Sequence, residues 1–109
     1  GVLTVFDAAS GKVLWERDLV RDLGATPVQF GFSASPVPMS GTFLVHVGGR
    51  ECAVAAFDVR IGAVRWKSEP AEPSYATPVV MDAPGGPQVL QVTRDALLGL
   101  RARDGATLW

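Results

Sequence analysis

The sequence has one cysteine, one histidine and no asparagine. The lone Cys52 excludes an internal disulfide bond and any metal site built from several cysteines, although it does not decide the redox compartment. We expect it to be a small buried strand residue. His46 lies between two valines, and because the chain has no second histidine we expect it to be structural rather than a ligand or a base.

The chain has ten Lys and Arg residues and eleven Asp and Glu residues, so its formal net charge is -1 and neither sign of charge is in excess. The basic residues are scattered singly, so no stripe exists that could neutralise a nucleic-acid backbone. The purely apolar runs are a few residues long, whereas roughly 20 residues are needed to span a bilayer. We therefore expect no nucleic-acid partner and no transmembrane segment.

Hydrophobic residues make up 48% of the 109 residues, which is typical of one small folded domain. They fall in short runs of strand length, divided by turn residues such as Ser40-Gly41 and Gly48-Gly49, and no window keeps a helical period. This pattern predicts an all-β chain of antiparallel hairpins. The candidate strands are residues 2–7, 12–18, 35–39, 42–47, 53–58, 63–67, 77–81, 88–93, 96–101 and 106–109.

One short motif occurs three times, as FDAASGKVLW at residues 6–15, FDVRIGAVRW at 57–66 and LRARDGATLW at 100–109. Each copy places a tryptophan four residues after a glycine, and a Ser/Thr-Pro-Val triplet opens the second and third units. A further triplet, at residues 26–28, lies too far upstream and is assigned to a connection. The predicted divisions are the outer half of a first unit at 1–18, a connection at 19–34, a second unit at 35–67, a connection at 68–76 and a third unit at 77–109.

The motif is suited to closing a hairpin, because a glycine can take the left-handed conformation that ends a short turn. Asp7 and Asp58 can accept hydrogen bonds from the turn N–H groups, whereas Arg101 stands in the third copy, which should be the weakest. Each tryptophan can bury about 150 to 250 Å² against the neighbouring unit, an upper bound of about 4 to 6 kcal/mol. We expect the three tryptophans to hold the units together.

Strands such as VAAFDV at 54–59 and DALLGL at 95–100 are apolar on both faces, so each sheet must be covered on both sides. Four-stranded units of about 40 to 45 residues, stacked around an axis, meet that need and are the blades of a β-propeller. The expected fold is therefore an all-β β-propeller fragment of about two and a half four-stranded antiparallel blades.

The motif D-x-x-x-G-x-x-x-W at 7–15 and 58–66, with GFSASPVPMSGTFLVHVGG at 31–49 and SYATPVV at 74–80, resembles the PQQ-like repeat of bacterial quinoprotein-type β-propellers. The resemblance covers nearly the whole chain and implies a closed parent ring of roughly seven or eight blades. The departures are Val5 and Gly99, where the pattern favours alanine, and Arg101, where it favours aspartate. Both ends of this chain, Gly1 and Trp109, look cut.

For catalytic members of this family, the resemblance implies PQQ and a calcium ion over the ring axis, held by carboxylates and amides and often beside two adjacent cysteines. The single Cys52 cannot supply that pair. The carboxylates of Glu51, Asp82 and Asp95 fall in turns, where a capping or solvated role is favoured. We expect no catalytic, cofactor-binding or metal-binding residue in this chain.

The strand order of a blade places the connections between units on the same face as the loops between the second and third strands, beside the axis. Arg50, Tyr75 and Arg94 come from these segments and are predicted to contact a partner, since arginine and tyrosine are enriched at interfaces. Phe30 and Phe32 are expected to pack beneath the long connection, because isolated aromatic residues are usually buried.

Two function classes remain open. The preferred one is a non-catalytic propeller segment, not an enzyme, that acts as a protein-interaction scaffold. The alternative is a fragment of a PQQ-dependent alcohol dehydrogenase whose cofactor site lies outside this chain. The family resemblance, which includes similarity to a lipoprotein of outer-membrane β-barrel assembly, implies a periplasmic or otherwise extracytoplasmic location. The expected partners are the missing blades, a second copy of the chain, or another protein.

Overall fold

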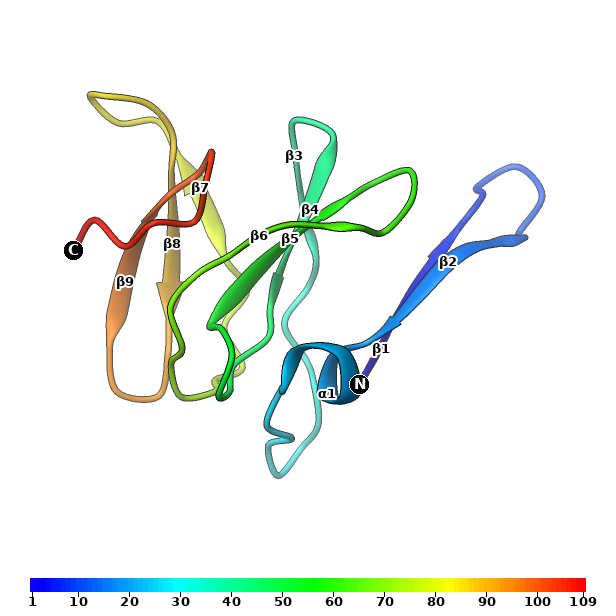
Figure 1. The fold of residues 1–109 in the computed structure, drawn as a ribbon, viewed down its shortest axis with the longest axis horizontal. Helices are drawn as coiled ribbons and strands as arrows, with labels where there is room; N and C mark the ends of the chain where they lie inside the picture. The colour runs from blue at the N-terminus through cyan, green and yellow to red at the C-terminus, as the bar shows by residue number, and fades with distance from the viewer.

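The computed structural model describes all residues from 1 to 109 and contains three antiparallel sheets of two, four and three strands. Figure 1 shows the sheets following one another across the molecule in chain order. The predicted all-β propeller fragment is therefore confirmed. The elements are β1 (Val2–Phe6), β2 (Val13–Asp18), α1 (Leu19–Leu23), β3 (Val37–Met39), β4 (Thr42–His46), β5 (Val54–Asp58), β6 (Val64–Lys67), β7 (Val79–Met81), β8 (Gln88–Val92) and β9 (Leu97–Arg101).

The third sheet has three strands rather than four, so the strand predicted at residues 106–109 is wrong. Only one bridge, between Leu100 and Thr107, joins this segment to β9. The N–H groups of Leu108 and Trp109 both point to the Gly99 carbonyl oxygen, at 2.7 and 3.4 Å. Two donors on one acceptor break the residue-by-residue register that a strand requires.

The first connection contains a short helix, α1, which the sequence analysis missed. The Asp18 carboxylate accepts hydrogen bonds from the N–H groups of Val20 and Arg21, and Gly24 closes the helix with a φ of 61°. Leu19 and Leu23 are buried against the first two sheets. Five residues are too few to show a helical period in the sequence, so only the two caps could have indicated it.

The repeated motif forms the same turn in all three copies. The glycine φ values are 69°, 66° and 75° at Gly11, Gly62 and Gly105. Each glycine N–H donates to the carbonyl oxygen four residues earlier, at 2.8, 2.9 and 2.8 Å. The expected left-handed turn conformation is therefore confirmed.

The side chain at the start of each turn differs in the way the sequence predicted. Asp7 accepts from the Ser10 N–H at 2.7 Å, and Asp58 accepts from the Arg60 N–H at 2.8 Å. Arg101 caps nothing, and instead its guanidinium pairs with Asp104 at 3.0 Å. The third turn therefore lacks the carboxylate cap of the other two.

Each of the first two tryptophans packs on the glycine turn of the next unit. The Trp15 ring lies over Gly62, and its Nε1 donates to the Val59 carbonyl oxygen at 3.0 Å. The Trp66 ring lies over Gly105, and its Nε1 donates to the Ala102 carbonyl oxygen at 3.1 Å. The same contact therefore joins the first unit to the second and the second to the third.

Trp109 departs from the expectation that all three tryptophans hold units together. It is 55% exposed, and its Nε1 donates to Gln88 Oε1 within the third unit at 3.1 Å. No fourth turn is present in this chain for its ring to cover.

The core lies in two layers, one on each side of the middle sheet. Trp15, Val45 and Phe57 belong to the layer shared with the first sheet, and Leu44 and Leu100 to the layer shared with the third. All five residues of β5 are buried, as a strand covered on both faces requires. In β9 the expectation holds only in part, because Leu97 is 52% exposed. The chain has no helix of the length and apolarity needed to cross a membrane.

Candidate functional site: the face of the connections

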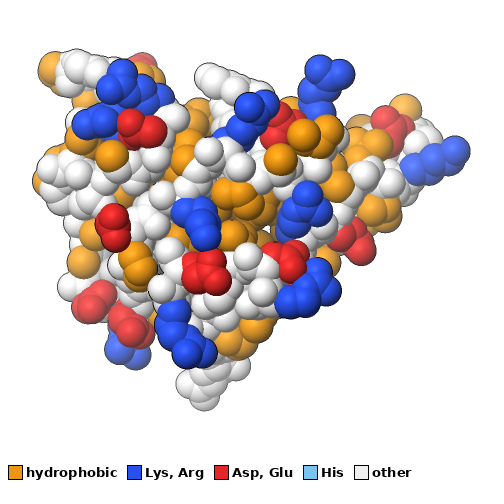
Figure 2. All heavy atoms as spheres, viewed as in Figure 1, with side chains coloured by type: hydrophobic (Ala, Val, Ile, Leu, Met, Phe, Trp, Pro, Cys, Tyr) orange, Lys and Arg blue, Asp and Glu red, His pale blue; other side chains and the backbone are white.

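The loops of the molecule gather at the two opposite ends of its strands. The hairpin turns at residues 7–12, 40–41 and 59–63, with the turn at 102–105, form what we name the turn face, at the upper edge in Figures 1 and 2. The connections at 24–36 and 68–78 and the turns at 47–53 and 93–96 form the connection face, at the lower edge. The predicted grouping of the connections with the turns between second and third strands is therefore confirmed.

The backbone of Gly49 contacts both connections of the connection face. It bridges Ala25 of the first connection on one side and Ala71 of the second connection on the other. Its φ is 154°, and a Cβ there would overlap the Gly24 carbonyl oxygen. Only glycine fits where three backbone segments lie this close, and backbone hydrogen bonds join the turn at 47–53 to both connections.

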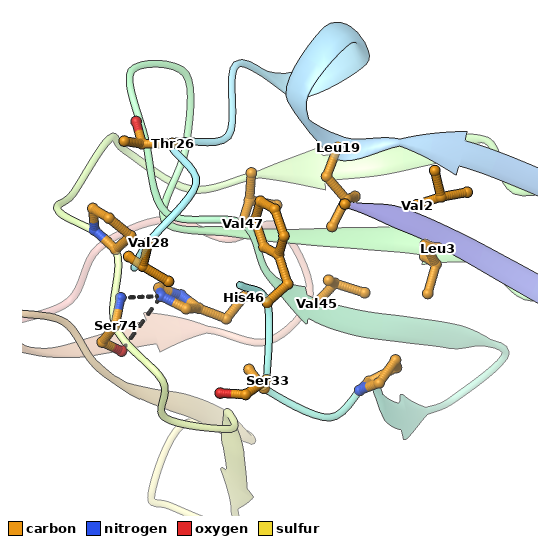
Figure 3. A pocket seen from close by; sticks show the side chains of 15 residues that line it. Val2, Leu3, Leu19, Thr26, Val28, Ser33, Val45, His46, Val47 and Ser74 are labelled. Atoms are coloured by element: carbon orange, nitrogen blue, oxygen red, sulfur yellow. Dashed lines mark hydrogen bonds between the residues drawn. The ribbon is translucent and has the colours of Figure 1, made fainter. Parts of the chain in front are cut away.

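His46 ties the second connection to β4 and has the structural character that the sequence predicted. The Ser74 N–H donates to its Nε2 at 2.9 Å, and Figure 3 shows the Ser74 backbone and hydroxyl both directed at that ring nitrogen. Because an N–H can only donate, Nε2 is unprotonated and the neutral ring carries its proton on Nδ1. Burial lowers the pKa of His46, and the nearby Ala53 carbonyl opposes this with a smaller effect.

A cavity of about 150 Å³ lies beside His46, bounded by β1, the first connection and β4 (Figure 3). Its lining includes Val2, Leu19, Val28 and Val45, with His46 and Ser74 as polar members. The Ser74 hydroxyl also donates to the Val92 carbonyl oxygen of β8 at 2.6 Å. His46 and Ser74 therefore link the second sheet to the third across this connection.

Of the three predicted contact residues, Arg50 lines a groove of about 480 Å³ on the connection face, and Arg94 lies next to it. Arg50 lines the groove, is exposed and makes no ion pair within the chain. Glu72 lines it too and pairs with Arg94 at 3.2 Å, so Arg94 borders the groove through that carboxylate. Thr26 and Asp95 complete its polar part.

Tyr75 lies apart from this groove and pairs with Phe30. Its hydroxyl accepts from the Phe30 N–H at 3.2 Å, and the two ring centroids are 6.1 Å apart. Phe30 is 79% exposed, so the expectation that it packs beneath the connection is wrong. A turn closed by the Gly31 N–H on the Val28 carbonyl oxygen holds Phe30 at the loop tip, where Tyr75 is its aromatic neighbour.

Comparison with known proteins gives a consistent family for this geometry. The sequence model of the family described as "Outer membrane protein assembly factor BamB" matches residues 1–109. The chain belongs to the BamB-type family of PQQ-like repeat proteins. It is 29% identical to the outer membrane protein assembly factor BamB of Yersinia pestis over 110 residues, and 29% identical to that of Moranella endobia over 115 residues.

These BamB proteins are longer than the present chain, which is covered completely but spans 27% of each of them. The crystal structure of BamB from Moraxella catarrhalis superimposes with a TM-score of 0.67 at 21% identity, covering 100% of this chain and 29% of that one. At this identity the superposition supports the fold. The BamB-type repeat thus accounts for the three recurring motifs.

The acidic side chains in two turns of the connection face are held by neighbours within the chain. No three His, Cys, Asp or Glu residues converge as metal ligands. Glu51 is paired with Lys67 at 2.9 Å, and Asp95 accepts from the Thr93 hydroxyl at 3.1 Å. Cys52 is buried, and burial raises the pKa of its thiol to about 11.

Proposed function

We propose that this chain is a non-catalytic scaffold segment of an outer membrane protein assembly factor, and that it binds a protein partner through its connection face. The relatives carry that assembly role in their names, and the match extends over every residue of the chain. Because the chain spans 27% of those relatives, the proposal concerns one part of a larger binding surface.

The observation that carries the proposal is the combination of a rigid backbone and unsatisfied side chains on one face. Gly49 bonds to both connections, so the loops need little ordering on binding, which lowers the entropic cost. Arg50 has no partner within the chain, and Phe30 exposes an aromatic ring beside Tyr75. Arginine and tyrosine are over-represented among the residues that dominate interface energies.

The same proposal places the chain outside the cytoplasm, on the periplasmic side, because its relatives are outer membrane assembly factors. It also takes the chain to bind neither PQQ nor calcium by itself. Calorimetric titration of the chain with both compounds together should give no heat of binding. A micromolar dissociation constant would favour the dehydrogenase alternative instead.

The partner can be identified by site-specific cross-linking in the bacterium that carries the protein. A photoreactive phenylalanine analogue at Arg50 should cross-link to a component of the outer membrane assembly machinery, identified by mass spectrometry. The same analogue at Lys12, on the turn face, is the matched control. Cross-linking from Lys12 but not from Arg50 would contradict the assignment of the connection face.

A further inference from the structure

We propose that a second groove, on the turn face between the second and third sheets, binds an acidic peptide segment of a partner protein. The groove has a volume of about 540 Å³, within the range of about 300 to 1,000 Å³ usual for ligand sites. One wall is formed by the hairpin turns that follow β3 and β5, and the other by the turn that follows β9. We name it the turn groove.

Three arginines line the turn groove and only one carboxylate accompanies them. Arg60 forms no ion pair with any residue of the chain. Arg65 donates hydrogen bonds from Nε and Nη2 to the Asp58 carboxylate, which leaves its Nη1 without a partner. The guanidinium of Arg103 lies 3.7 Å from Asp104, a carboxylate that Arg101 already holds at 3.0 Å. Figure 2 shows basic side chains along this edge of the molecule. The groove therefore has unused donors for anionic groups.

The walls of the turn groove are fixed before any ligand arrives. The Trp66 Nε1 bonds to the Ala102 carbonyl oxygen across the two units. The Val59 N–H bonds to the Gly41 carbonyl oxygen at 3.0 Å, which joins the two hairpin turns of one wall. Donors held on such walls lose little conformational freedom on binding, which favours affinity.

The side chains that line the turn groove indicate which kind of ligand it can bind. Guanidinium groups match carboxylates with paired hydrogen bonds, so acidic side chains suit the rim. Met39 and Trp66 are large apolar residues of the lining and suit contact with one hydrophobic side chain of the peptide. The groove is open along the surface rather than enclosed, which suits an extended peptide better than a small molecule. A chain of net charge -1 with scattered basic residues is poorly suited to nucleic acid.

This proposal does not depend on the connection face. The turn groove lies at the opposite end of the strands, and both units that form it are present in the chain. Loss of binding at one face leaves the other intact, so the two proposals succeed or fail separately.

The test is fluorescence anisotropy of the full chain with a fluorescein-labelled peptide that has a central leucine flanked by glutamates. We expect saturable binding that weakens with added salt. Arg60→Glu and Arg103→Glu should each weaken it by about tenfold or more, because each reverses a charge at the rim. Lys12→Glu makes the same change of charge on another hairpin turn and should leave binding within about twofold.

The neutral variants Arg60→Gln and Arg103→Gln, checked by thermal melting, provide the same test if a charge reversal disturbs folding. They too should weaken binding, though less. Equal binding by wild type, Arg60→Gln and Arg60→Glu would overturn the proposal, as would an equal loss in Lys12→Glu. Complete displacement of the peptide by inorganic phosphate would also overturn it, because the site would then recognise a small anion.

Discussion

The ring of Trp15 lies so close over Gly62 that a Cβ on this glycine would be 2.5 Å from Cδ2 of the tryptophan. The glycine therefore serves two purposes, since its φ of 66° is strained for any other residue and its missing side chain makes room for the ring. Its counterpart Gly11 has a φ of 69° and nothing within 4 Å of the position of a Cβ. Substitutions at these two glycines therefore distinguish the cost of backbone strain from the cost of displacing the tryptophan ring.

Gly62→Val should therefore destabilise the chain more than Gly11→Val. Gly11→Val bears only the backbone penalty, about 1 to 3 kcal/mol. Gly62→Val bears that penalty and also displaces Trp15, which adds about 1 to 3 kcal/mol. Urea unfolding of both variants measures the difference, and equal midpoints would mean that the Trp15 contact contributes nothing.

The tryptophans should differ in importance according to what they cover. Trp15→Ala removes a ring that is 7% exposed and should cost about 3 to 5 kcal/mol. Trp109→Ala removes a ring that is 55% exposed and should change the free energy of unfolding by less than about 1 kcal/mol in this chain. Thermal melts of the two variants check this order, and an equal cost would contradict the packing described above.

His46 should make the chain less stable as the pH falls. Its pKa is lowered in the folded state, so the unfolded chain takes up the proton first, and stability is lost as the pH falls below the ordinary histidine value of about 6.5 and through the folded value. The pKa of Asp58 is lowered by Arg65 and that of Asp7 by Ser10, so both stay ionised in this range.

The measurement is urea unfolding at neutral and mildly acidic pH for the wild type and for His46→Gln. The variant should lose less stability on acidification, because glutamine does not titrate and its amide oxygen can accept from the Ser74 N–H. An identical loss in both proteins would place the pH dependence elsewhere.

The isolated 109-residue chain should self-associate. The first sheet has two strands, and apolar residues such as Val13, Leu14 and Val79 are more than half exposed. Unpaired strand edges and apolar patches recruit further chains. Light scattering at micromolar concentration should report dimers or larger species. A monodisperse, stably folded monomer would contradict this prediction.

The repeat explains why so much of the fold could be predicted. A glycine followed four residues later by a tryptophan predicts a tight turn and then a large side chain on the returning strand. Gly62 and Trp66 have this arrangement. The sequence predicted that each tryptophan packs on the neighbouring unit, but not that Trp15 covers the glycine turn there, 47 residues along at Gly62. Contacts between units depend on stacking, which spacing alone does not fix.

The candidate site was only partly predictable for a related reason. Arg50 and Arg94 lie on the same face because each belongs to the turn between the second and third strands of its unit, a position that topology fixes. The exposure of Phe30 depends on one local turn at Gly31, which no periodicity reveals. The arginines of the turn groove belong to different units, so their meeting depends on how the units pack.

The most direct test of the scaffold proposal is complementation in the parent bacterium with the gene for this protein deleted. The full protein carrying Arg50→Glu and Arg94→Glu should accumulate normally, yet fail to restore folded outer membrane proteins, measured by their altered gel mobility without heating. Lys12→Glu should restore them. Full restoration by the Arg50→Glu and Arg94→Glu protein would contradict the claim that the connection face is the binding surface.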